Sequence, residues 1–244
     1  MQNVISTIIA ILLICTLGMT TAESQDMRFG AKAGISLYNA TSSISISGLG
    51  GNDFSVDETS DRRLGFAVGA FAIIPVNEKF SFQPELMFVQ KGGKFSDDFI
   101  DDDDFFDDDV FFDENDFFDD EGGTAELTFN YLDIPLLVRF DIPSEGSVAP
   151  YLTAGPVVGI LLSANEKFNG ESSSIDDEMK TFNFGLSLGA GVSVNQLHFD
   201  LRYEIGLANI FDAIEEEDDD FDDFFDLDVS FKTSGLMLTI GYSF

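Results

Sequence analysis

Three segments in the second half of the chain alternate between large apolar residues and small or charged ones, and this pattern constrains the fold most. In residues 182–192 the even positions are Phe, Phe, Leu, Leu, Ala and Val, and the odd positions are Asn, Gly, Ser, Gly and Gly. Residues 197–205 alternate Leu, Phe, Leu, Tyr and Ile with His, Asp, Arg and Glu, and residues 235–244 alternate in the same way. Because successive side chains of a strand point to opposite faces, each segment is predicted to be a strand with one apolar face.

The second face of these segments decides between a soluble and a membrane fold. It is rich in glycine on one strand and ionic on the next, which suits the narrow inside of a barrel better than the solvated surface of a sandwich. Large apolar residues outward and small or polar residues inward is typical of a transmembrane β-barrel. Strands of ~10–13 residues match the ~9–11 residues needed to cross a bilayer at a tilt.

Eight such segments can be counted, and eight is a common size for these barrels. They cover residues 28–38, 63–75, 79–91, 128–141, 148–162, 181–193, 197–206 and 232–244. The connections alternate in length: 76–78, 142–147 and 194–196 are short, whereas 39–62, 92–127, 163–180 and 207–231 are long. The predicted fold is an all-β, eight-stranded antiparallel up-and-down transmembrane β-barrel with short periplasmic turns, long extracellular loops and both termini in the periplasm.

The first 22 residues are predicted to be a cleaved signal peptide, which leaves residues 23–244 as one barrel domain. Residues 4–17 are almost continuously apolar, and Thr20-Thr21-Ala22 offers small residues for cleavage. This run is shorter than the ~20 residues of a membrane helix. The alternatives are a single-span anchor and a lipoprotein lipidated at Cys15, which is the only cysteine. The mature chain is therefore expected to have no disulfide and no thiolate metal site.

The net charge of −33 is concentrated in two tracts. Residues 97–121 hold 15 acids and residues 212–228 hold 11, with no Lys or Arg in either window. They belong to two predicted loop inserts, residues 95–127 and 207–231, in which the sequence Asp-Phe-Phe-Asp occurs three times. Tracts of this charge would repel the phosphates of nucleic acid, which is excluded as a direct partner.

Two interpretations of the acidic tracts remain open. They could be mobile low-complexity loops kept in solution by their own charge, or they could bind divalent cations weakly, because carboxylate oxygens are the ligands that Ca²⁺ prefers. No glycine interrupts the acid runs as a calcium loop requires, so any binding is expected to be weak and no other cofactor is predicted. The candidate calcium ligands are Asp101, Asp102, Asp103, Asp104, Asp107, Asp108, Asp109, Asp218, Asp219, Asp220, Asp222 and Asp223.

The alternation also predicts which charged residues face the inside of the barrel. An eight-stranded barrel is just wide enough for side chains to fill it, and buried charges must be paired. The predicted lumen network consists of Lys32, Glu85, Asp133, Arg139, Asp200, Arg202 and Glu204, with His198 also facing inward. We expect it to be a structural plug of ion pairs; a proton or ion pathway and a catalytic site are the alternatives. His198 is the only histidine, so no His–His metal motif is possible.

The last residues carry a further signal. Ile240, Tyr242 and Phe244 place large side chains at alternating positions up to the final residue. This pattern resembles the signal that the barrel-assembly machinery reads, and it also suits anchoring in the interface between lipid and water.

Several short motifs resemble those of the PorT-like outer-membrane β-barrel family of Bacteroidetes, over nearly the whole mature chain. They are Gln83-Pro84-Glu85-Leu86, Gln90-Lys91-Gly92-Gly93, Tyr131-Leu132-Asp133-Ile134-Pro135-Leu136-Leu137, Ala154-Gly155-Pro156, and Arg202-Tyr203 followed by Gly206-Leu207. The resemblance implies a small barrel in the bacterial outer membrane. The founding member is associated with export by the type IX secretion system, whereas most relatives have no assigned activity.

The sequence contains no nucleophile elbow, phosphate loop, zinc motif or Rossmann fingerprint. We therefore expect a non-enzymatic outer-membrane barrel that presents acidic surface loops, with a structural or surface-interaction role. Its expected partners are outer-membrane lipid, the assembly machinery during biogenesis, and envelope or secretion-system proteins. The alternatives are an accessory component of a secretion or transport system, a weakly cation-binding adhesin, and a soluble periplasmic lipocalin-like binder.

Overall fold

The computed structural model describes residues 27–49, 52–95, 125–168, 171–175, 179–210 and 226–244, all in or next to one antiparallel sheet. Its strands are β1 (Arg28–Leu49), β2 (Asn52–Thr59), β3 (Asp61–Pro75), β4 (Phe80–Phe95), β5 (Ala125–Asp141), β6 (Val148–Phe168), β7 (Glu171–Ser174), β8 (Phe182–Val194), β9 (Leu197–Gly206) and β10 (Asp226–Ser243). No described segment is a helix with the length and apolar character needed to cross a membrane.

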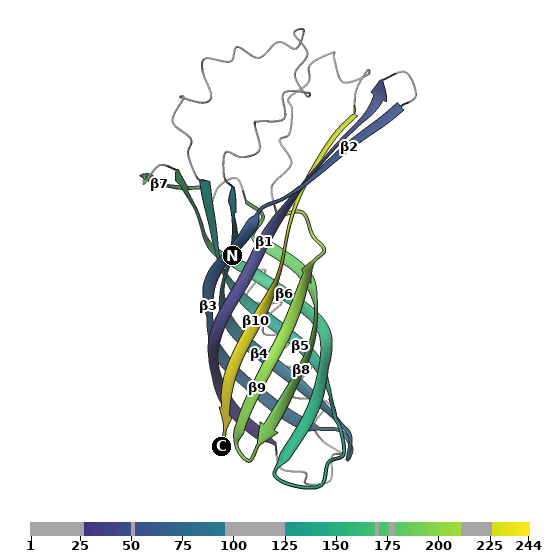
Figure 1. Ribbon diagram of the computed structural model, residues 1–244, viewed down its shortest axis with the longest axis vertical. Coiled ribbons are helices and arrows are strands. Elements are labelled where there is room, and N and C mark those ends of the chain that lie inside the picture. Colours follow the sequence, from purple (N-terminus) through teal and green to yellow (C-terminus); the bar gives the residue numbers. More distant parts are fainter. Residues whose placement is uncertain (1–26, 50–51, 96–124, 169–170, 176–178, 211–225) are drawn as a thin grey trace, which may run out of the picture.

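Eight of these strands close into a barrel, as Figure 1 shows. The order is β10-β9-β8-β6-β5-β4-β3-β1, and β1 pairs back to β10 from Gly30 opposite Ser243 to Ser47 opposite Asp226. Each neighbour along the chain is antiparallel. The predicted fold class is confirmed, and the eight predicted segments correspond to the eight barrel strands.

The predicted lengths of the long connections are wrong where strands continue past the barrel wall. β1 runs on to Leu49 and pairs there with β2 on one side and with β10 on the other, so residues 39–62 are mostly strand. β6 continues to Phe168 and pairs with β7. β10 begins at Asp226, and β5 at Ala125. These extensions all leave the barrel at one end, which we call the loop end (Figure 1).

The opposite end, which we call the turn end, carries three short connections, at residues 76–79, 142–147 and 195–196. Asn195 has φ of 56°, a left-handed conformation that asparagine tolerates better than most residues and that two-residue hairpins favour. β1 begins and β10 ends at this same end. Both ends of the described chain therefore lie beside the short turns.

The outer surface of the barrel is apolar. Leu186, Leu201 and Leu238 are 46–52% exposed, although each lies within a strand that is paired on both sides. Phe29, Phe80 and Tyr242 form a half-exposed aromatic band near the turn end, and Phe66, Phe184 and Tyr203 lie on the outer face toward the loop end. An apolar wall between two aromatic bands is the surface that a bilayer requires.

Candidate functional site

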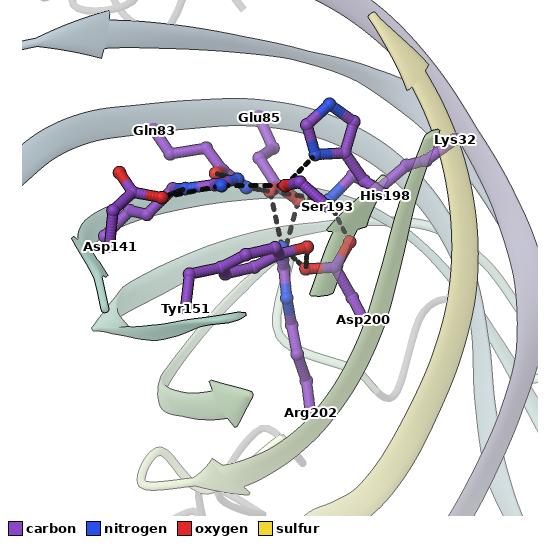
Figure 2. A network of polar contacts seen from close by, with 10 residues as sticks. Lys32, Gln83, Glu85, Asp141, Tyr151, Ser193, His198, Asp200 and Arg202 are labelled. Carbon is purple, nitrogen blue, oxygen red and sulfur yellow. Dashed lines mark hydrogen bonds and ion pairs between the residues drawn. The ribbon is translucent and has the colours of Figure 1, made fainter. Parts of the chain in front are cut away.

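The barrel lumen is the candidate site because it gathers the buried charged residues of four strands, β1, β4, β5 and β9. Glu85 on β4 lies at its centre. Arg202 on β9 donates two parallel hydrogen bonds to the Glu85 carboxylate, both 2.7 Å long, and Lys32 on β1 donates another at 2.8 Å (Figure 2). Gln83 Nε2 donates a fourth at 2.7 Å. Charge-assisted, bidentate contacts of this kind are the strongest hydrogen bonds available to a carboxylate.

Asp200, on the same strand as Arg202, belongs to the same cluster. Its carboxylate lies 3.3 Å from Lys32 Nζ and 3.4 Å from Arg202 Nη2, and it accepts a hydrogen bond of 2.8 Å from the Tyr151 hydroxyl. Glycines on β8 give these long side chains room. A Cβ at Gly189 would lie 2.7 Å from Arg202 Cγ, and one at Gly191 would lie 2.4 Å from Tyr151 Cζ. The glycines of β8 therefore provide the space that the side chains of Arg202 and Tyr151 occupy.

A second charged cluster lies nearer the loop end. Lys91 Nζ on β4 is 2.8 Å from Asp133 on β5 and 3.2 Å from Glu204 on β9. The Tyr38 hydroxyl donates to Glu204. The ammonium group of Lys91 also lies 5.2 Å from the ring centres of both Tyr38 and Tyr131, within cation–π range.

A third cluster closes the lumen at the turn end. Arg139 pairs with Asp141 at 2.8 Å and donates to Ser193 at 2.9 Å. The two ring nitrogens of His198 each lie 3.0 Å from a serine hydroxyl, one on Ser193 and one on Ser243. In Figure 2, Asp141, Ser193 and His198 lie along one line of polar contacts. His198 is therefore bound within the wall on both sides and does not face an open cleft.

The charges buried in the described lumen balance. Four cations and four carboxylates have relative exposures of 5% or less: Lys32, Lys91, Arg139, Arg202, Glu85, Asp133, Asp200 and Glu204. Lys32, Lys91 and Arg202 pair with the four carboxylates, whereas Arg139 pairs with the partly exposed Asp141. Burying an unpaired ion costs several kcal/mol, so paired charges are the arrangement that a narrow lumen tolerates. These eight residues therefore add nothing to the net charge of −33, most of which comes from the two acidic tracts.

An apolar cluster, here called the loop-end apolar cluster, lies above the charged layers. Its buried members are Ala40, Leu127, Phe129, Tyr131, Ala164, Met179, Ile210 and Phe231. Two of them come from connections between strands. Lys180 N donates to Ile210 O at 2.8 Å, and Ile210 N donates to Phe231 O at 3.0 Å, so these two connections are tied to each other and to β10 at the loop end.

All seven residues of the sequence-predicted network lie in the lumen, and the structure distributes them over the three clusters just described. Sequence reasoning missed Lys91, which shares the inward parity of Glu85 but sits beside the glycines that end the predicted strand. It also missed the hydroxyls of Tyr38 and Tyr151, which the alternation of β1 and β6 would have placed inward. Ile240, Tyr242 and Phe244 lie on the outer face, 54%, 48% and 76% exposed.

The candidate calcium ligands of residues 101–109 and 218–223 lie outside the described residues, as does the predicted signal peptide of residues 1–22. Their roles stay predictions. Among the residues that are described, no group of three or more His, Cys, Asp or Glu side chains could hold a metal ion.

A closed antiparallel barrel of eight strands, with an apolar exterior and an ion-paired lumen, is a transmembrane β-barrel. Comparison with known families gives the narrower assignment. The chain belongs to the family described as outer membrane protein beta-barrel domain, whose sequence profile matches residues 22–212. It is accordingly a protein of the bacterial outer membrane. The profile does not single out the PorT-like branch, so that narrower resemblance stays a prediction.

Several solved structures are similar to this chain at low identity. Neisserial surface protein A is 12% identical with a TM-score of 0.42, over 90% of this chain and 100% of that chain. Ail of Yersinia pestis is 18% identical with a TM-score of 0.34, over 88% and 99%. OprG of Pseudomonas aeruginosa is 12% identical with a TM-score of 0.43, over 89% and 95%. No curated protein sequence matches significantly.

Proposed function

We propose that this protein is a non-enzymatic, non-conducting outer-membrane barrel whose role lies in the surface that it presents at the loop end. The observation that carries the proposal is the filled lumen. Four cations and four carboxylates of the described wall are buried inside it, each within ion-pair distance of a partner, and the loop-end apolar cluster lies at one end of it. A wide aqueous channel needs a lumen free of such contacts, as the larger porins have.

The acidic tracts belong to connections that leave the described barrel at the loop end. Phe95 and Ala125 flank the first tract; Ile210 precedes the second, whose last three residues, 226–228, belong to β10. In outer-membrane barrels long loops are extracellular and short turns periplasmic. The tracts would therefore face the outside of the cell, where their charge favours cationic partners or weak, salt-sensitive binding of divalent cations.

Conductance tests the filled lumen. After reconstitution in a planar bilayer, the wild-type protein is expected to show no steady single-channel current, because the ion pairs of the lumen leave no continuous water path. Insertion is checked separately by the shift in gel mobility that folded barrels show before heating. Large, steady currents from verified, folded protein would overturn the proposal.

Surface labelling tests the orientation, and the chain suits it because Cys15 is its only cysteine. Glu145 lies exposed in a turn and Ser173 lies exposed on β7 at the loop end. A membrane-impermeant maleimide is expected to label Ser173→Cys on intact cells and Glu145→Cys only after lysis. The parent chain is the matched control and is expected to stay unlabelled. Labelling of Glu145→Cys on intact cells, with Ser173→Cys protected, would reverse the topology.

A further inference from the structure

A small cavity opens beside the second charged cluster of the lumen. Its volume is about 10 Å³, and the polar side chains that line it belong to Lys91, Asn183, Glu204 and Thr233. A volume of this size holds about one water molecule. Three of the lining residues are glycines from three different strands, and a Cβ at Gly159 would lie only 2.8 Å from Asp133 Oδ1. The missing side chains thus keep the space open.

The polar atoms around this cavity lack partners. Asn183 Oδ1, Glu204 Oε1 and Thr233 Oγ1 are buried and have no hydrogen-bond partner among the described protein atoms. Each of these three residues is at most 4% exposed. Leaving a buried polar group unsatisfied costs roughly 1–3 kcal/mol. Three such atoms on one cavity indicate that a ligand with its own hydrogen-bonding groups completes them.

We propose that the cavity holds an internal water molecule that joins β8, β9 and β10 beside Lys91. The water donates to Glu204 Oε1 and Asn183 Oδ1, and it accepts from the Thr233 hydroxyl or from Lys91. Lys91 has three N–H donors, of which its two carboxylate contacts use two. Three or four bonds is the usual complement of a buried water.

The ammonium group of Lys91 disfavours a cation in that position. The Lys91 ammonium already lies between Asp133 and Glu204, at 2.8 and 3.2 Å, so a second positive charge would meet it at close range. Phe231, two residues further along β10 toward the loop end, belongs to the loop-end apolar cluster. The water would therefore lie between an ion-paired layer and an apolar one and would exchange slowly with bulk solvent.

β10 offers a matched pair of threonines for the test. Thr233 and Thr239 are 2% and 1% exposed, and the hydroxyl of each lacks a hydrogen-bond partner, but only Thr233 lines the cavity. Thr→Val keeps the shape and removes the hydroxyl. If water satisfies Thr233, Thr233→Val raises the unfolding equilibrium constant roughly tenfold, the value of one hydrogen bond. Thr239→Val removes only an unsatisfied group, so its stability is expected to equal or exceed that of the wild type.

Nuclear magnetic resonance in lipid nanodiscs can detect the bound water directly. The side-chain amide of Asn183 is expected to show a rotating-frame cross peak at the water frequency, with the sign of direct contact rather than of proton exchange. Thr233→Val weakens or removes the peak, and Thr239→Val leaves it unchanged. Absence of the peak in the wild type, or equal stability changes in the two variants, would overturn the proposal. The wild-type spectrum decides the question even if Thr233→Val fails to fold.

Discussion

Replacing Glu85 by Leu is expected to abolish stable folding of the barrel. The Glu85 carboxylate is the shared acceptor of Lys32, Gln83 and Arg202, and its removal leaves a net positive charge in the closed lumen. Breaking a buried ion pair by removing one partner costs about 3–5 kcal/mol, a large part of the roughly 5–15 kcal/mol that stabilises a typical domain. The measurement is urea unfolding in lipid vesicles, followed by gel mobility before and after heating.

Three further variants separate charge from packing at Glu85. Glu85→Gln keeps the size and is expected to fall between Glu85→Leu and the wild type. The double variant Glu85→Leu with Arg202→Met removes the opposing charge as well, so it should be more stable than Glu85→Leu alone. Glu145→Gln, in an exposed turn, should change stability by no more than about 0.5 kcal/mol. A Glu85→Leu protein with the wild-type urea midpoint would show that the ion-paired lumen does not hold the barrel together.

Placing an arginine at Leu201 tests the opposite face of the same strand. Leu201 lies in the middle of β9, 52% exposed between Ala190 and Leu238 on the outer wall. An arginine on the lipid face at the bilayer midplane costs about 2–4 kcal/mol, and near the interface only about 0–1 kcal/mol. Leu201→Arg should therefore lower the urea midpoint strongly in vesicles.

Leu197→Arg is the matched control, because Leu197 begins the same strand beside the short turn at residues 195–196 and is 42% exposed on the same face. It should have little effect. Equal, small effects of both substitutions would mean that no hydrocarbon layer surrounds the middle of the barrel. A large effect of Leu201→Arg alone would place the bilayer midplane at the level of Arg202, with lipid outside the wall and the ion pairs inside.

The length of β1 and the position of Lys91 are two features that the alternation pattern did not predict. Residues 41–49 are mainly Ser, Ile and Thr with a Gly, a composition that reads as a loop; they form a strand because β2 and β10 pair with them on either side. Lys91 reads as part of a glycine turn. It becomes the centre of a cluster only when β4 lies in register with β5 and the barrel has closed toward β9.

The alternation pattern did not predict the loop-end apolar cluster either. Met179 and Ile210 lie in connections without strand periodicity, and nothing local indicates that they turn inward. Backbone hydrogen bonds between distant segments, such as Lys180 to Ile210 and Ile210 to Phe231, place them there.

The sequence by itself determined the closed barrel, its apolar exterior, and most of the charged residues that face inward, because the two-residue period of a strand assigns a side chain to a face without knowledge of its neighbours. Only the tertiary structure decided which of those inward residues meet. Lys32 and Asp200 lie 168 positions apart in the chain and 3.3 Å apart in space. Their contact depends on the register in which eight strands close on one another, which no local pattern records.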